Sequence, residues 1–213
     1  MSTFLDPDQI ASRYPGDGIG CPTAVERLVV AVACDTLWRM DNLLTREKLV
    51  AFLSQLGGKA RSRGACYLTG GASALLVGWR ETTLDVDLKF DPEPLGVFDA
   101  IPELKKSLQI NVELASPDDF IPVPADWKSN SPFVGQYGEL SVYHFDFTAQ
   151  ALSKIERGHP KDLLDVREML RRGLTSKDQL FTMLQAIRPL VRRYPAIDEE
   201  TFVSRIESFV REA

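Results

Sequence analysis

The sequence has little cysteine and little histidine, with three cysteines and two histidines in 213 residues. Cys21, Cys34 and Cys66 show no spacing typical of a metal site, and their odd number provides no disulfide framework. His144 and His159 are isolated, so neither is expected to bind a metal or to act in catalysis. We therefore expect free thiols and a functional site that does not depend on histidine.

A long apolar segment and an excess of basic residues are also missing. The longest apolar run, 28–34, is much shorter than the about 20 residues that a membrane-spanning helix needs. Residues 1–8 contain neither the basic region nor the apolar run of a signal peptide. The formal net charge of -5 argues against broad nonspecific nucleic-acid binding. These features predict a cytoplasmic protein that has no membrane partner.

The 44% hydrophobic content is sufficient for a sizeable core. Residues 1–44 are expected to form a lead-in and one helix, which spans about 23–40. Residues 45–146 alternate between helical and strand patterns, whereas residues 147–213 are helical throughout. The predicted fold class is therefore α/β (α+β), with a sheet flanked by helices and followed by a C-terminal helical bundle.

Apolar periodicity, caps and turn residues place the individual elements. The expected order is a helix from the cap Thr45 to Gly57-Gly58, a strand at 66–69, a short helix carrying Ser73, a strand at 84–90, a helix ending near 108, a strand at 109–115, a loop at 116–131, strands at 133–137 and 139–145, and helices at 148–155 (cap Thr148), 161–172, 175–193 (cap Thr175) and 198–210.

A glycine turn follows the strand at 66–69 and begins a short helix. Gly70 and Gly71 leave the backbone bare, so an anion can approach the N–H groups at the start of that helix. Ser73 lies in the first helical turn and can donate its hydroxyl to a phosphate oxygen. The turn is therefore a candidate phosphate-binding element, although a plain structural turn is the alternative.

Two carboxylates alternate with apolar residues in the next expected strand. Side chains in a strand alternate between its faces, so Asp85 and Asp87 share one face. The opposite, core-facing side carries Leu84, Val86 and Leu88. Two carboxylates about 6–7 Å apart along a strand repel each other unless a cation lies between them. Mg²⁺ is a suitable cation, because it binds one or two carboxylates together with substrate phosphates.

Gly-Gly-x-Ser, followed about a dozen residues later by hydrophobic-Asp-hydrophobic-Asp-hydrophobic, resembles the signature of the DNA-polymerase-β-like nucleotidyltransferase superfamily. The resemblance implies a small mixed sheet and a site for Mg²⁺ or Mn²⁺. It implies that Asp85 and Asp87 are catalytic metal ligands, and that Gly70, Gly71 and Ser73 bind a nucleoside triphosphate. Many members have Gly-Ser directly, whereas the serine here lies two places further on.

The expected strand at 109–115 adds a third carboxylate. Ile110, Val112 and Leu114 share one face and Glu113 lies on the other. This pattern resembles the third carboxylate strand of the superfamily, which implies that Glu113 is a catalytic residue and a ligand of a second metal ion. The alternative is an exposed acid on an edge strand.

A second constellation lies in the helical half. Lys154, followed by Lys161-Asp-Leu-Leu-Asp165, resembles the C-terminal motif of AbiEii-type toxins and related small bacterial nucleotidyltransferases. The resemblance implies that Lys154 is a catalytic, phosphate-binding residue and that Asp165 or Asp162 completes the nucleotide pocket. Acids in the first turn of a helix that complement its dipole, beside a solvated lysine, are the alternative.

The resemblance implies an enzyme that transfers a nucleoside monophosphate from a nucleoside triphosphate to an acceptor hydroxyl. The toxin resemblance favours tRNA as acceptor and an antitoxin protein as partner. The acidic net charge favours a protein or an aminoglycoside-like small molecule. A catalytically silent nucleotide-binding or interaction protein is the alternative from another class, and the presence of both Asp85 and Asp87 argues against it.

Overall fold

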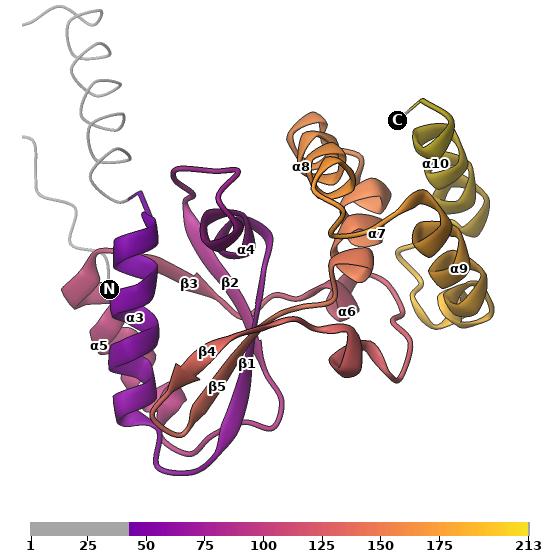
Figure 1. Cartoon of the computed structure of the whole chain (residues 1–213). Helices are drawn as coiled ribbons and strands as arrows, with labels where there is room; N and C mark the ends of the chain where they lie inside the picture. The colour runs from indigo at the N-terminus through magenta and orange to yellow at the C-terminus, as the bar shows by residue number, and fades with distance from the viewer. Residues whose placement is uncertain (1–42, 213) are drawn as a thin grey trace, which may run out of the picture. The chain divides into compact units, whose positions relative to one another are not determined.

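A five-stranded mixed sheet organises residues 43–212, the part of the chain that the computed structural model describes (Figure 1). Its order is β3-β2-β1-β5-β4. β1 pairs antiparallel with β2 and parallel with β5, β2 pairs parallel with β3, and β4 pairs antiparallel with β5. The strands are β1 (Gly64–Thr69), β2 (Asp85–Phe90), β3 (Asn111–Glu113), β4 (Phe133–Tyr137) and β5 (Leu140–His144). The predicted fold class is confirmed.

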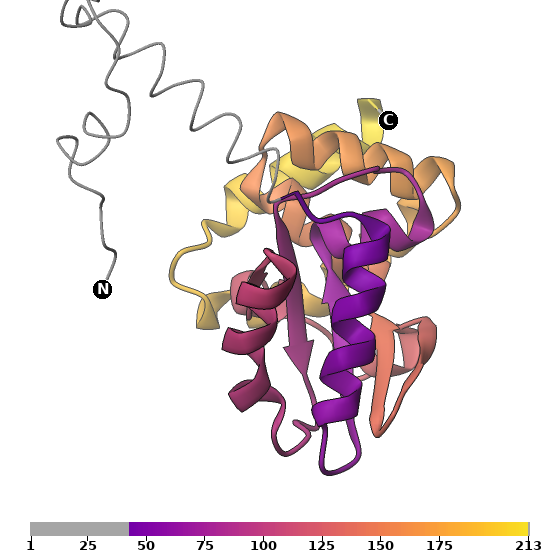
Figure 2. The same ribbon diagram turned by 90° about the vertical axis from the view of Figure 1, so that its left-hand side faces the viewer.

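Helices surround the sheet and continue to the C-terminus. They are α3 (Arg46–Lys59), α4 (Gly70–Val77), α5 (Val97–Leu108), α6 (Pro117–Phe120), α7 (Phe147–Arg157), α8 (Pro160–Arg171), α9 (Lys177–Ile187) and α10 (Glu199–Glu212), with 3-10 turns η1 (Trp127–Asn130) and η2 (Arg188–Arg193). Both views place α3 and α5 together on one side of the sheet (Figures 1 and 2).

Side-chain caps fix where several helices begin. Thr45 accepts a hydrogen bond from the N–H of Lys48, as expected from the sequence. The predicted caps Thr148 and Thr175 are wrong, because Asp146 and Ser176 cap α7 and α9 instead. The two threonine hydroxyls hydrogen-bond to each other at 2.9 Å.

The central strand β1 is buried along its whole length because both of its faces are covered. Cys66 and Leu68 belong to a cluster formed with α3, α5 and the neighbouring strands. Ala65 and Tyr67 belong to a second cluster, which includes Phe145 and the helices α7 to α10. The alternation of side chains along one strand thus joins the sheet to the helical half.

The edges of several elements differ from the prediction. Leu84 and Leu114 are exposed rather than buried, because β2 begins at Asp85 and β3 ends at Glu113. Alternation along a strand no longer applies beyond these ends. Helix α3 runs past Gly57 to Lys59. A Cβ at Gly57 would lie 2.1 Å from the Tyr137 carbonyl oxygen, so that glycine allows close packing rather than ending the helix.

The predicted lead-in and helix at 23–40 lie outside the described residues. Within the described residues, the predicted boundary at 146 coincides with the start of α7 at Phe147, although both sides belong to one compact unit. Cys66 is a free, buried thiol. None of the helices in residues 43–212 has both the length and the apolar character needed to cross a membrane.

Candidate functional site

The strand register places acidic side chains of β2 and β3 next to each other. Asp87 pairs with Glu113, and Asp85 pairs with Asn111 two residues earlier on both strands. On its other side, Asp87 is paired with Thr69, the last residue of β1. The predicted strand face therefore exists, and it carries Asp85, Asp87 and Glu113 together.

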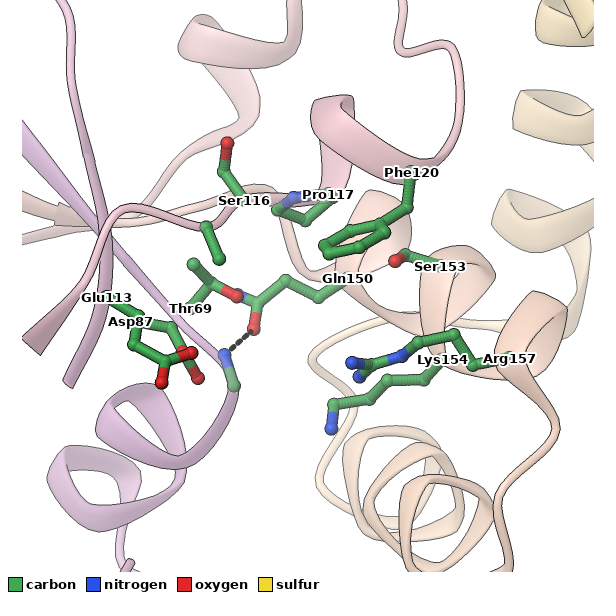
Figure 3. A pocket seen from close by; sticks show the side chains of 12 residues that line it. Thr69, Asp87, Glu113, Ser116, Pro117, Phe120, Gln150, Ser153, Lys154 and Arg157 are labelled. Atoms are coloured by element: carbon green, nitrogen blue, oxygen red, sulfur yellow. Dashed lines mark hydrogen bonds between the residues drawn. The ribbon is translucent and has the colours of Figure 1, made fainter. Parts of the chain in front are cut away.

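A small cavity of about 120 Å³ opens beside this face (Figure 3). Asp87 and Glu113 lie on one side of the cavity, and Lys154 and Arg157 lie on the other (Figure 3). The full lining consists of Thr69, Gly70, Asp87, Glu113, Ala115, Ser116, Pro117, Phe120, Gln150, Ser153, Lys154 and Arg157. Sheet, glycine turn and helix α7 thus meet around one space.

The carboxyl group of Asp87 has a raised pKa. Burial, together with the negative charges of Asp85 and Glu113, raises the pKa of its carboxyl to about 6, while Lys154 and Arg157 act in the opposite direction. Within residues 43–212, no hydrogen-bond donor contacts the Asp87 carboxylate. A cation bound at this position would relieve the repulsion directly.

The donor atoms suit a hard divalent cation. Asp85, Asp87 and Glu113 offer only carboxylate oxygens, which Mg²⁺ and Mn²⁺ prefer. The Asn111 side-chain amide bridges two of them, donating to Asp85 Oδ1 at 2.7 Å and to Glu113 Oε1 at 3.0 Å. No three acidic, histidine or cysteine side chains among the described residues are gathered in metal-ligand geometry. The Asn111 amide thus occupies one oxygen of Asp85 and one of Glu113 and does not contact Asp87.

Lys154 is held by a buried ionic network. Its ammonium lies 2.8 Å from Asp162 Oδ1 and 2.7 Å from Asp165 Oδ2, and its side chain is only 6% exposed. Asp165 also accepts hydrogen bonds from Arg80 and from the Trp79 indole. Asp165, for which the sequence predicted a nucleotide contact, does not line the cavity and instead holds Lys154 and Arg80 in place.

Gly70 lies at the cavity, as predicted. Its φ of +55° is in the left-handed region that favours glycine, and a Cβ here would lie 2.7 Å from Asp87 Oδ2. Its N–H donates to Gln150 Oε1 at 2.9 Å, and the Gln150 amide donates in turn to the Phe145 carbonyl. Gln150 therefore fixes the glycine turn against α7.

Gly71 and Ser73, for which the sequence predicted phosphate contacts, are not among the residues that line the cavity. A Cβ at Gly71 would lie 2.1 Å from Thr83 Oγ1, so this glycine allows close packing. The fully buried Ser73 hydroxyl donates to the Leu68 carbonyl at 3.0 Å and lies 3.0 Å from His144 Nδ1. The structure assigns both residues to the core.

Burial also explains the state of His144. It lowers the pKa of the imidazole to about 4, so the ring is neutral at physiological pH. The Ser73 hydroxyl donates its proton to the Leu68 carbonyl, so its oxygen accepts a hydrogen bond from the Nδ1–H of His144. His144 is thus structural, in agreement with its isolation in the sequence.

Several residues around the cavity were not predicted from the sequence. Gln150 and Arg157 lie four residues before and three residues after Lys154, so all three share one face of α7. That spacing was a usable signal once Lys154 had been selected. No comparable local signal pointed to Asn111 or Arg80, because their roles depend on strand pairing and on contacts far along the chain.

Comparison with known proteins adds no assignment. No family model matches the chain, and no curated protein or solved structure matches it either.

Proposed function

We propose that this protein is a metal-dependent nucleotidyltransferase. The observation that carries the proposal is the paired Asp87 and Glu113 on β2 and β3, facing Lys154 and Arg157 across one cavity. A carboxylate group that lacks a cation suits a divalent metal, and a cationic wall opposite it suits phosphates. Nucleoside triphosphates are substrates that bring these two requirements together.

The residues would divide the work as follows. Asp85, Asp87 and Glu113 would hold Mg²⁺ or Mn²⁺, and the chemistry that such a metal would supply is electrostatic stabilisation of the oxygens in an in-line displacement. Lys154 and Arg157 compensate the negative charge of the triphosphate. Glu113, which is exposed, accepts the proton of the acceptor hydroxyl. The acceptor oxygen forms a bond to the α-phosphorus, and the bond to pyrophosphate breaks.

The size of the cavity bears on the substrates. Its volume of about 120 Å³ is below the roughly 300–1,000 Å³ of sites that enclose a whole small molecule. Only part of a nucleotide would be enclosed, and the acceptor would approach from the open side. A tRNA, a protein and an aminoglycoside-like molecule are all compatible with this arrangement, as is an antitoxin partner that covers the opening.

The direct test is transfer of labelled α-phosphate from each of the four ribonucleoside triphosphates to total tRNA, protein extract and aminoglycosides. We expect labelling of one acceptor class with Mg²⁺ or Mn²⁺, and none after chelation by EDTA. The Asp87→Asn protein, purified identically, controls for contaminating enzymes. Absence of labelling by the wild type with every nucleotide, metal and acceptor would favour a silent nucleotide-binding protein.

The Ser73→Ala variant should keep full nucleotide affinity and turnover, because the hydroxyl faces the core. The variant leaves the Leu68 carbonyl and His144 without this partner, so we expect its free energy of unfolding to fall by about 1–3 kcal/mol. Urea denaturation measures the loss, with the exposed Ser129→Ala as a matched control. If the Ser73→Ala protein folds but binds nucleotide more weakly, the phosphate contact that the sequence predicted for Ser73 would be supported.

A further inference from the structure

An exposed aromatic ring lies on the wall of the cavity. Among the exposed large apolar side chains of residues 43–212, Phe120 is the one that lines it, and it is 41% exposed. The Arg157 guanidinium lies 5.7 Å from the centroid of the Phe120 ring. A flat ring beside a flat cation offers a stacking surface next to the cationic wall.

The ring is held in place by its short helix. The Ser116 N–H donates to Asp119 Oδ2 at 2.8 Å, which closes a capping box at the start of α6. Lys89 on β2 pairs with Asp118 at 2.7 Å, and Tyr194 donates to the Asp118 carbonyl. Because α6 is tied to the sheet and to the C-terminal half, the Phe120 ring is held in position before a ligand binds. Binding to the ring therefore needs no rearrangement of α6.

A polar group accompanies the ring. Ser153 lines the same cavity and is only 4% exposed, yet its side chain makes no hydrogen bond within residues 43–212. Among residues 43–212 every fully buried side-chain polar atom has a partner, so the Ser153 hydroxyl reaches the surface of the cavity, where a ligand can hydrogen-bond to it. Ser153 and Lys154 both line this cavity, so the hydroxyl and the proposed phosphate contact border the same space.

We infer that Phe120 and Ser153 form a nucleobase subsite for the incoming nucleoside triphosphate, an inference that rests on the proposed function. The Phe120 ring stacks on the base, Arg157 supports the stack, and the Ser153 hydroxyl hydrogen-bonds to the nucleoside. Stacking tolerates any base because every base presents a π face. The subsite therefore favours nucleotides over inorganic phosphates without selecting strongly among the four bases.

The test measures equilibrium binding of each ribonucleoside triphosphate and of inorganic tripolyphosphate, all with Mg²⁺. Tripolyphosphate keeps the charge of the substrate and lacks the base. We expect Phe120→Ala to weaken binding of every nucleoside triphosphate by about 10-fold or more, with tripolyphosphate affinity unchanged. Phe120→Tyr should retain wild-type affinity, and Ser153→Ala should weaken nucleotide binding by about 5-fold.

Phe181→Ala is the matched control, because Phe181 is 36% exposed and does not line the cavity. Unchanged nucleotide binding by Phe120→Ala would overturn the subsite. So would an equal loss of nucleotide and tripolyphosphate affinity, because Phe120 would then act only by supporting Arg157. If the wild type binds neither ligand, the proposed function fails together with the subsite.

Discussion

The Asp87→Asn variant is expected to lose all metal-dependent nucleotide transfer and yet to unfold at a higher temperature than the wild type. Both effects follow from the same charge. Asp87 is largely buried, pairs with Glu113 in the strand register and lies near Asp85, and Lys154 and Arg157 offset only part of the resulting penalty. Asparagine removes the repulsion, and it also removes the carboxylate that the metal requires.

The raised pKa of Asp87 determines how the free energy of unfolding changes with pH. The folded protein raises the pKa of Asp87 from 3.8 to about 6, so it binds this proton more tightly than the unfolded chain does. Stability therefore falls as the pH rises from about 4 to about 6, and the full penalty applies above that range. A pKa difference of this size corresponds to a destabilisation on the order of 3 kcal/mol, in the absence of metal.

Thermal unfolding with and without Mg²⁺ measures both effects. Without metal, Asp87→Asn should raise the midpoint by about 2–4 °C for each kcal/mol of repulsion relieved. Mg²⁺ should stabilise the wild type at neutral pH and leave the variant unchanged, because only the wild type binds it. Asp99→Asn, at an exposed acid on α5, is the control and should behave as the wild type. A Mg²⁺ response that survives in Asp87→Asn would remove Asp87 from the metal site.

Local patterns in the sequence were sufficient to predict the fold class and the carboxylate face. Successive side chains of a strand point to opposite faces, so Asp85 and Asp87 had to lie on the face opposite the buried Val86 and Leu88. The cap Thr45 marked the start of α3 for a similar reason, since its hydrogen bond spans only three residues.

The fine structure of the site depended on contacts that no local pattern contains. Ser73 enters the core because the Leu68 carbonyl and His144 meet there, 71 residues apart in the case of His144. Phe120 reaches the cavity because α6 packs against α7, whereas the sequence indicated only a loop at 116–131. The strand predicted from Gln109 begins only at Asn111, because Gln109 is the C-cap of α5, with a left-handed φ of 51°.

Substitution of Lys154 should have the second large effect. A cation opposite the metal-binding face matters most as charge develops on the leaving pyrophosphate, so Lys154→Ala should lower turnover more than nucleotide affinity. Loss of one such electrostatic contact costs about 10²–10³ in rate. The geometry adds a complication, because Lys154 also neutralises Asp162 and Asp165 in a buried network.

Breaking a buried ion pair on one side destabilises a protein by about 3–5 kcal/mol, and the assay must separate that loss from catalysis. Arg80→Met provides the matched control. Arg80 lies 2.6 Å from Asp165 in the same network and does not line the cavity, so its removal perturbs the network and leaves the Lys154 charge in place. The double variant Lys154→Met, Asp162→Asn removes one charge of each sign and should recover part of the stability, but not the turnover.

Turnover of all variants is compared at a temperature well below the lowest unfolding midpoint, with affinity measured separately for the same nucleotide. We expect Lys154→Ala and the double variant to be slow, and Arg80→Met to turn over nearly as fast as the wild type despite its lower stability. Equal losses in Arg80→Met and Lys154→Ala would mean that the network contributes only to folding. Wild-type turnover in Lys154→Ala would leave Arg157 as the cation that faces Asp87 from α7.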